Sequence, residues 1–213
     1  MTVVGIVPAA GLGERLGGSS PKAFSVLGGR QLLDWSLEVL EEVCDRVVVA
    51  VPEGYEDGED RVRGGASRSA SVRSALRAAP EASIAVVHDA ARPLVTRELV
   101  ERCLAALEPD WDGAIAAAPV TDTVKEAAGD GRVLRTLERS GLWAVQTPQV
   151  FRAESLRRAL DVDDETLAAA TDDAALVEAA GGPVRVVEAP AENLKVTRQL
   201  DLLVAESLLR SRA

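Results

Sequence analysis

The sequence predicts an α/β domain built as a three-layer sandwich, in which a mostly parallel sheet lies between two layers of helices. Short apolar runs rich in valine and alanine recur along the chain, and amphipathic segments of helical period separate them. Strands that alternate with helices in this way form βαβ units, whose strands are parallel. Because 213 residues fit one domain of ordinary size, we expect residues 1–213 to form a single domain.

The strands of this sheet are expected where apolar runs end at glycine, proline or charged residues. They are residues 3–8, 46–51, 84–87, 114–119, 145–151 and 184–188. Pro148 interrupts the fifth run, and it predicts an edge strand or a bend there because proline cannot donate a hydrogen bond to a neighbouring strand.

Helices are expected in the amphipathic and alanine-rich segments between the strands. They are residues 32–43, 66–79, 96–107 (capped by Thr96), 153–160, 172–180 and 198–209. Residues 53–63 are highly charged and predict a loop. Residues 120–143 alternate around the turn at 128–131, which predicts an inserted β-hairpin arm that projects from the domain.

Composition excludes several classes of function. The net charge of −10 disfavours general binding to nucleic acids or anionic membranes. Cys44 and Cys103 are isolated thiols, which suit a reducing compartment, and the absence of a signal peptide or a long apolar run makes the cytoplasm the expected location. His88 is the only histidine, so we expect neither a histidine-based hydrolase nor a zinc site.

A glycine-rich loop follows the first predicted strand and is the strongest functional signal. Four glycines lie between residues 11 and 18, and Arg15 and Lys22 belong to the same loop. Glycines let backbone N–H groups approach an anion closely, and two added cations favour more than one phosphate group. The loop matches neither a P-loop nor a dinucleotide fingerprint, in which a glycine would replace Leu16. The alternative is a tight turn with surface charges.

Other polar segments follow the later strands. They are residues 88–93, 122–123, 146–149 and 193–197. Ligands of open α/β sheets bind beyond the carboxyl ends of the strands, so we expect these segments to converge on one cleft with the glycine-rich loop.

Three residues of these segments each have two interpretations. Asp89 either caps a helix or offers a carboxylate to a hard cation or a ligand hydroxyl. Arg92 is either a surface cation or a bidentate clamp for a phosphate. Lys195 is either a solvated lysine or a cation of the cleft, and we expect His88 to be structural.

Eight ordered motifs give the chain a close resemblance to a known family. They are P-A-A-G-x-G-x-R at 8–15, P-K at 21–22, G-G-x-x-R-x-x-S-V at 64–72, V-H-D-A-A-R-P at 87–93, D-T-V-K at 122–125, Q-T-P-Q-x-F at 146–151, T-D-D-A at 171–174 and N-x-K-V-T at 193–197. In this order the chain resembles the 2-C-methyl-D-erythritol 4-phosphate cytidylyltransferases of the non-mevalonate isoprenoid route. The resemblance covers nearly the whole chain.

The resemblance implies a Rossmann-like nucleotidyltransferase fold and an in-line attack of the methylerythritol phosphate on the α-phosphate of CTP. The implied catalytic residues are Arg15, Lys22, Arg139 and Lys195. The implied nucleotide-binding residues are Ala9, Ala10, Gly11, Gly13, Gly65, Ser71 and Asp89. The implied residues for the polyol phosphate are Asp89, Arg92, Thr123, Arg139, Thr147 and Lys195.

The resemblance also implies partners for the chain. Mg²⁺ or another divalent cation would be held mainly by the CTP phosphates, with Asp89 as a further candidate ligand. A homodimer with exchanged arms would bring Thr123 and Arg139 to the neighbouring subunit's site. The chain ends after one such domain, so we expect no fused cyclodiphosphate synthase.

The chain departs from the family pattern at Ala23, where a glutamine is usual, and at Ala66 and Ala70, where polar residues are common. The nearest rival function is that of a ribitol 5-phosphate cytidylyltransferase. Nucleotidyltransferases for sugar phosphates or a molybdopterin cofactor are less similar rivals. A catalytically silent nucleotide-binding protein is an alternative from another class.

Overall fold

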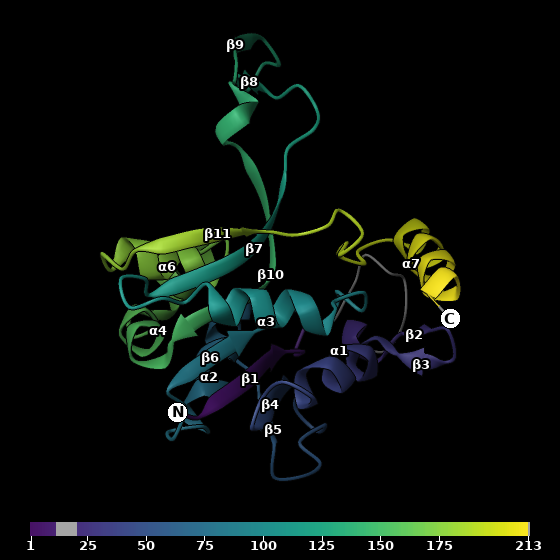
Figure 1. Ribbon diagram of the computed structural model, residues 1–213, viewed down its shortest axis with the longest axis vertical. Helices are drawn as coiled ribbons and strands as arrows, with labels where there is room; N and C mark the ends of the chain where they lie inside the picture. The colour runs from purple at the N-terminus through teal and green to yellow at the C-terminus, as the bar shows by residue number, and fades with distance from the viewer. Residues whose placement is uncertain (12–20, 213) are drawn as a thin grey trace.

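The predicted three-layer α/β architecture is confirmed by a computed structural model, which describes residues 1–11 and 21–212 (Figure 1). Within these residues the central sheet has seven strands in the order β11-β7-β10-β6-β1-β4-β5. The strands are β1 (Val3–Pro8), β4 (Arg46–Val51), β5 (Arg61–Arg63), β6 (Ile84–Val87), β7 (Gly113–Pro119), β10 (Trp143–Arg152) and β11 (Val184–Glu188).

The sheet is mostly parallel, as expected, with one exception. β10 pairs antiparallel with both β6 and β7, whereas the β1–β4, β1–β6, β7–β11 and β4–β5 pairs are parallel. The strand that contains Pro148 therefore lies inside the sheet, and the expectation of an edge strand is wrong. The expectation of a bend is correct, because the register with β7 shifts between Val145 and Gln149.

Period-two alternation explains why both faces of the sheet are covered. In β4, Val48 and Ala50 join one hydrophobic cluster, while Val47, Val49 and Val51 join the cluster on the opposite face. Successive side chains of a strand point to opposite faces, so a run that is apolar throughout must be buried on both sides. The sequence of β4 thus requires helices on both faces of the sheet.

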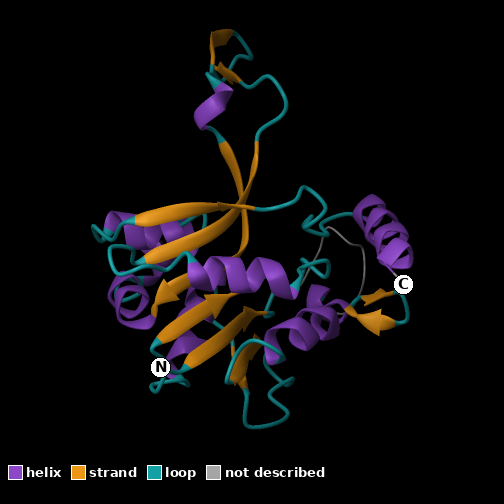
Figure 2. Cartoon of the chain, viewed as in Figure 1, coloured by secondary structure: helices purple, strands orange, loops and turns teal. Residues whose placement is uncertain are grey.

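Helices occupy both faces of the sheet (Figure 2). α1 (Leu32–Glu41) and α3 (Arg97–Ala105) contribute to one cluster, and four helices contribute to the other. These four are α2 (Arg68–Arg77), α4 (Ala153–Ala159), α5 (Asp164–Ala169) and α6 (Asp173–Ala179). As predicted, Thr96 caps α3, since its side chain accepts a hydrogen bond from the Leu99 amide.

β5 and α5 are two of the short elements that were not predicted. β5 lies within the segment expected to be a loop, and it adds to the sheet edge beside β4. α5 packs against α2, and Leu167 inserts into the core there. Both elements are too short to show a clear period, and tertiary contacts decide their structure.

The predicted arm is a separate two-stranded ribbon that projects from the domain (Figure 1). β8 (Lys125–Ala127) pairs antiparallel with β9 (Val133–Thr136), and the short helix η3 (Arg139–Gly141) follows. Val133 and Leu134 remain exposed by 56% and 53%. A two-stranded ribbon is marginally stable alone, so its apolar side chains need a partner surface.

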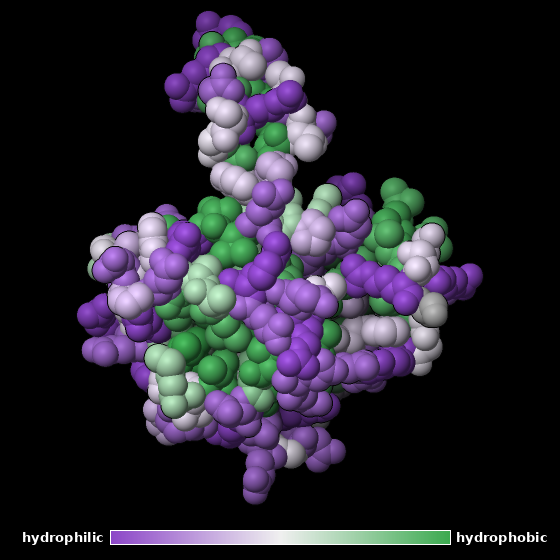
Figure 3. All heavy atoms as spheres, viewed as in Figure 1, coloured by the Kyte–Doolittle hydropathy of each residue, from purple (hydrophilic) through white to green (hydrophobic). Residues whose placement is uncertain are grey.

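A third small cluster holds the C-terminal helix α7 (Gln199–Arg212) against the hairpin of β2 (Val26–Leu27) and β3 (Arg30–Gln31). The turn of that hairpin falls at Gly28 and Gly29, which both have positive φ. Leu200 and Leu203 of α7 remain exposed, and Figure 3 shows hydrophobic spheres over this helix. Among the described residues, no helix has the length and apolar character needed to cross a membrane.

Candidate functional site

A cavity of about 360 Å³ opens where the first strand ends. Its walls come from four places: the segment after β1, the start of α2, the segment after β6 and the segment after β11. They include Ala10, Gly11, Lys22, Gly65, Ser67, Arg68, Ser71, Asp89 and Lys195. Lys22 is the first residue of the short helix η2 (Lys22–Phe24), and its backbone amide donates to the carbonyl of Gly11. The glycine-rich segment therefore borders this cavity at both of its described ends.

The back of this cavity depends on two adjacent glycines. A Cβ atom at Gly64 would lie 2.4 Å from the Cβ of Ala10, and one at Gly65 would lie 2.5 Å from the Cβ of Ala70. The Gly65 amide donates to Oγ of Ser71, 3.1 Å away. Glycines at this point let the start of α2 pack directly on the β1 loop, which leaves space for a ligand in front of it.

Four charged residues form a connected cluster beside the cavity, and three of them, Arg68, Asp89 and Lys195, line it. Asp89 accepts from Nε of Arg68 at 2.9 Å through Oδ1, and from Nζ of Lys195 at 2.7 Å through Oδ2. The Arg68 guanidinium also reaches Oδ2 of Asp173, which is 2.5 Å from Nη1. These residues come from α2, the segment after β6, the segment after β11 and α6. We call them the charged wall.

The charged wall keeps Asp89 ionised. Burial alone would raise the pKa of Asp89, but the charges of Arg68 and Lys195 outweigh burial and hold this pKa well below its usual range. Burial raises the pKa of Asp173, although Arg68 opposes that change. The two carboxylates in turn raise the pKa of Arg68 in spite of its own burial.

A second cavity, also of about 360 Å³, lies on the other side of the same wall. Arg68, Asp89 and Lys195 line both cavities. The second cavity is completed by Arg92 of the segment after β6, by residues of β10 and by the segment before α6. The residues of β10 and of the segment before α6 include Val145, Gln146, Thr147, Gln149, Thr171 and Asp172. The two cavities are therefore neighbours that share three charged side chains.

The polar residues around the second cavity are fixed by buried hydrogen bonds. Oγ1 of Thr147 accepts from the Asp89 amide at 3.0 Å and lies 3.1 Å from Nδ1 of His88. Nε2 of His88 lies 3.2 Å from the Arg92 carbonyl, and burial lowers the pKa of His88 to about 4. His88 is thus a neutral, fully buried side chain, which agrees with the structural role expected for it.

Arg92 and Asn193 connect the second cavity to the segment after β11. Nη1 of Arg92 donates to the Asn193 carbonyl at 2.7 Å, and Nδ2 of Asn193 donates to Oε1 of Gln146 at 2.7 Å and to the Thr147 carbonyl at 2.9 Å. These bonds hold residues 193–195 against β10. They explain how Lys195, which lies in an irregular segment, reaches Asp89.

The family model described as "IspD: 2-C-methyl-D-erythritol 4-phosphate cytidylyltransferase" matches residues 3–211. The chain belongs to this family. A relative from Frankia casuarinae that carries the same name is 47% identical over 97% of this chain and 81% of its own length. The Nocardia farcinica relative of that name is 43% identical over 100% of this chain and 96% of its own.

Solved structures agree with this family assignment. The crystal structure of the Thermus thermophilus 2-C-methyl-D-erythritol 4-phosphate cytidylyltransferase has a TM-score of 0.84 and 39% identity, and the match covers 99% of this chain and 100% of that one. The Francisella tularensis structure of the same name has a TM-score of 0.82 at 30% identity, with 97% of this chain and 99% of that chain covered.

Most of the residues that the family resemblance implied lie at these two cavities. Lys22, Ala10, Gly11, Gly65 and Ser71 line the first, Arg92 and Thr147 line the second, and Asp89 and Lys195 line both. Ala9 is buried behind the first cavity, where its amide donates to the Ala50 carbonyl. Arg15 and Gly13 lie outside the described residues.

Thr123 and Arg139 are not brought to the cavities of their own chain. Both are exposed residues of the arm, and the Arg139 guanidinium donates to the carbonyl of Thr121 within the same arm. The arm projects from the domain (Figure 1), and neither residue lines either of the two cavities.

Arg68 and Asp173 are site residues that were assigned no role from the sequence. Both stand in segments that carry the family resemblance, and both are the first residue of a helix, after the N-caps Ser67 and Asp172. The signal for Arg68 was its position four residues after Gly64 within a matched motif. Only the fold shows that these two residues meet.

The described residues do not form a metal site by themselves. They contain no cluster of three or more histidine, cysteine, aspartate or glutamate residues arranged to hold a metal ion. Asp89 was a candidate ligand, but both of its carboxylate oxygens already pair with cations. A divalent cation would therefore need oxygen ligands from the nucleotide.

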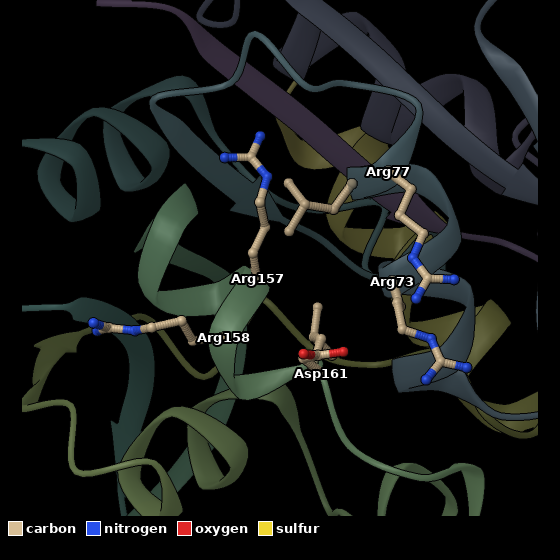
Figure 4. Close-up of a pocket in the computed structure, with 7 residues that line it drawn as sticks. Arg73, Arg77, Arg157, Arg158 and Asp161 are labelled. Atoms are coloured by element: carbon tan, nitrogen blue, oxygen red, sulfur yellow. The ribbon is translucent and has the colours of Figure 1, made fainter.

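Another cavity, of about 350 Å³, lies between α2 and α4 and is rich in arginine (Figure 4). Two of its arginines already make hydrogen bonds or ion pairs within the protein. Arg157 donates to the carbonyls of residues 79, 80 and 82, and Arg73 pairs with Asp164. In Figure 4 the Arg158 guanidinium points away from Asp161. This cavity contains none of the residues implied for the family's reaction.

Proposed function

We propose that the chain transfers a cytidylyl group from CTP to 2-C-methyl-D-erythritol 4-phosphate, giving 4-diphosphocytidyl-2-C-methyl-D-erythritol and pyrophosphate. The observation that carries this proposal is the pair of neighbouring cavities that share Arg68, Asp89 and Lys195. A reaction between two phosphates needs two binding sites that meet at the reacting atoms, with cations at the junction.

The first cavity takes the nucleotide. Gly64 and Gly65 leave space for it, and Ser71 and the amide of Gly65 lie beside that space. Lys22 borders the same cavity. A lysine there, with Arg15 of the adjoining loop, would offset the charge that grows on the α-phosphate and on the leaving pyrophosphate.

The second cavity takes the polyol phosphate. Arg92 and Thr147 line it, and Lys195 reaches it from the charged wall. A phosphate oxygen held there attacks the α-phosphorus in line from the side opposite the pyrophosphate. This step needs no protein nucleophile, so positioning and cationic groups carry the catalysis.

A divalent cation, Mg²⁺ by preference, accompanies the triphosphate in this proposal. Nucleotide phosphates offer the oxygen ligands that Mg²⁺ prefers, so the described protein residues need to supply few further oxygen ligands. When bound, the ion would neutralise phosphate charge. Chelation of the assay mixture should therefore abolish turnover, and readdition of Mg²⁺ should restore it.

The working form in this proposal is a homodimer whose residues 120–143 form the exchanged arms. The exposed apolar side chains Val133 and Leu134 support it, as does the projection of the arm from the domain in Figure 1. The partner's arm would bring Thr123 and Arg139 to the second cavity.

We further propose a cytoplasmic location, which the free thiols of Cys44 and Cys103 favour.

A pyrophosphate-release assay tests the reaction. CTP, ATP, GTP and UTP are each paired with methylerythritol phosphate and with ribitol 5-phosphate. We expect release with CTP and methylerythritol phosphate above every other pair. Higher turnover with ribitol 5-phosphate would assign the rival cytidylyltransferase, and no release with any pair would assign a silent nucleotide-binding protein.

A further inference from the structure

Asp173 is a buried carboxylate aimed at a residue that lines both cavities. It is 0% exposed and is the first residue of α6. It is absent from the walls of both cavities, whereas its neighbour Asp172 lines the second one. A carboxylate buried to this degree is costly unless a cation pairs with it, and Arg68 is that cation, 2.5 Å away.

Arg68 is held by two carboxylates that leave part of its guanidinium available. Nε donates to Asp89, and Nη1 donates to Asp173. Among the described residues, none accepts a hydrogen bond from Nη2. A guanidinium is a rigid planar fork, so two bonds to fixed acceptors determine where its remaining donors lie.

We infer that Asp173 is a positioning residue for the reaction: it fixes Arg68, and through Arg68 the carboxylate of Asp89, on the wall between the two cavities. Arg68 then offers Nη2 to a substrate phosphate from a fixed position. Asp173 touches no substrate and acts only through Arg68. The kinetic part of this inference rests on the proposed function, whereas the physical link between Asp173, Arg68 and Asp89 does not.

Charge gives this arrangement a specific kinetic signature. Asp89, Asp173, Arg68 and Lys195 together carry no net charge, so loss of the Asp173 carboxylate leaves the wall with an excess positive charge. An excess positive charge attracts the triphosphate of CTP at least as strongly as before. A displaced guanidinium, by contrast, slows the chemical step.

Asp173→Asn tests this signature, because asparagine keeps the shape of the side chain and removes its charge. We expect kcat to fall about 10-fold to 100-fold, as for a displacement of about 1 Å, while KM for CTP stays equal or decreases. The matched control is Asp163→Asn, which makes the same change at the exposed cap of α5, where Asp163 accepts from the Thr166 amide, and should leave both constants unchanged. A rise in KM with kcat unchanged would overturn the inference.

Two variants of Arg68 separate positioning from simple folding. In the Arg68→Ala background, Asp173→Asn should cause no further fall in kcat, because the guanidinium that Asp173 positions is absent. Arg68→Lys should have a kcat no higher than that of Arg68→Ala, because an ammonium group cannot bind two carboxylates with the geometry of a planar guanidinium. Added guanidinium at about 20 mM should raise the turnover of Arg68→Ala, but not that of the double variant Arg68→Ala/Asp173→Asn. Equal rescue of both variants would contradict a positioning role.

A readout without substrates keeps the inference testable if the proposed function fails. We compare the urea midpoints of three variants: Asp173→Asn, Asp89→Asn and the double variant. Each is measured twice, once in the chain that retains Arg68 and once in the chain that carries Arg68→Ala. We expect non-additive shifts when Arg68 is present and additive shifts when it is absent. Additive shifts in both backgrounds would overturn the link, whatever the activity of the chain.

Discussion

Gly65 packs directly on Ala70, so closely that a Cβ atom at Gly65 would lie 2.5 Å from the Cβ of Ala70 and 2.8 Å from its backbone carbonyl carbon. Both residues belong to the stretch that forms the back of the first cavity. Backbone atoms of a helix cannot move aside as a flexible side chain can. The space available to a nucleotide therefore depends on the absence of a single methyl group.

We expect Gly65→Ala to push the loop away from α2, to weaken CTP binding and to lower the free energy of unfolding by about 1–3 kcal/mol, the usual cost of an overpacked site. Calorimetric titration with CTP and urea unfolding measure the two effects. Gly129→Ala is the matched control, because a Cβ atom at Gly129 meets no atom within 4 Å. Unchanged affinity in Gly65→Ala would show that this contact does not shape the nucleotide site.

Lys22 borders the first cavity at the end of the glycine-rich loop. We expect Lys22→Ala to lower kcat about 10²-fold to 10³-fold, the cost of removing one preorganised group that stabilises transition-state charge. Steady-state pyrophosphate release measures kcat, and circular dichroism checks the fold. Arg30→Ala, which removes an exposed cation paired with Glu38, serves as the control. Turnover near that of the unaltered chain, with an intact spectrum, would remove Lys22 from the mechanism.

His88 links the stability of the second cavity to pH. Burial lowers its pKa to about 4 from 6.5, so the unfolded chain binds the proton more readily than the folded chain between these values. The stability that neutral His88 contributes is present above pH 6.5 and is lost as the pH falls toward 4. From about pH 7.5 to about pH 5 this loss amounts to about 2 kcal/mol.

Urea unfolding of the unaltered chain and of His88→Gln at several pH values isolates this contribution. Carboxylates elsewhere affect both proteins alike, so the difference between the two pH profiles belongs to the histidine. We expect the variant to have the shallower loss of stability on acidification. Parallel profiles would mean that folding leaves the pKa of His88 unchanged.

The arm should control the oligomeric state. We expect the double substitution Val133→Ser/Leu134→Ser to remove the apolar contact between subunits, to give a monomer and to reduce turnover, because Thr123 and Arg139 no longer reach a neighbouring site. Light scattering at micromolar concentration measures the mass. Val162→Ser, at another exposed apolar position, should leave it unchanged. An unaltered chain that is monomeric and fully active would disprove the exchanged-arm dimer.

Local pattern was enough to predict the longer elements of the fold. The bounds of β1, β4, β6 and β11 match the predicted strands, and the cap at Thr96 is correct. These features depend on periodicity, on capping chemistry and on where apolar runs end, which are all properties of neighbouring residues. The antiparallel direction of β10 was not predicted, because strand direction depends on what the strand pairs with.

The sequence by itself also determined most of the segments that face the cavities, since residues after parallel strands meet at one edge of a sheet. Residues 122–123 were expected in the same cleft, but they lie in the arm and line neither cavity. Only the tertiary structure decided which side chains pair there. Arg68 looked like one more charged residue on a helix, and Asp173 looked like one more acid after a cap. Their contact joins elements far apart in the chain, and burial makes it matter, because a carboxylate removed from water must find a cation nearby.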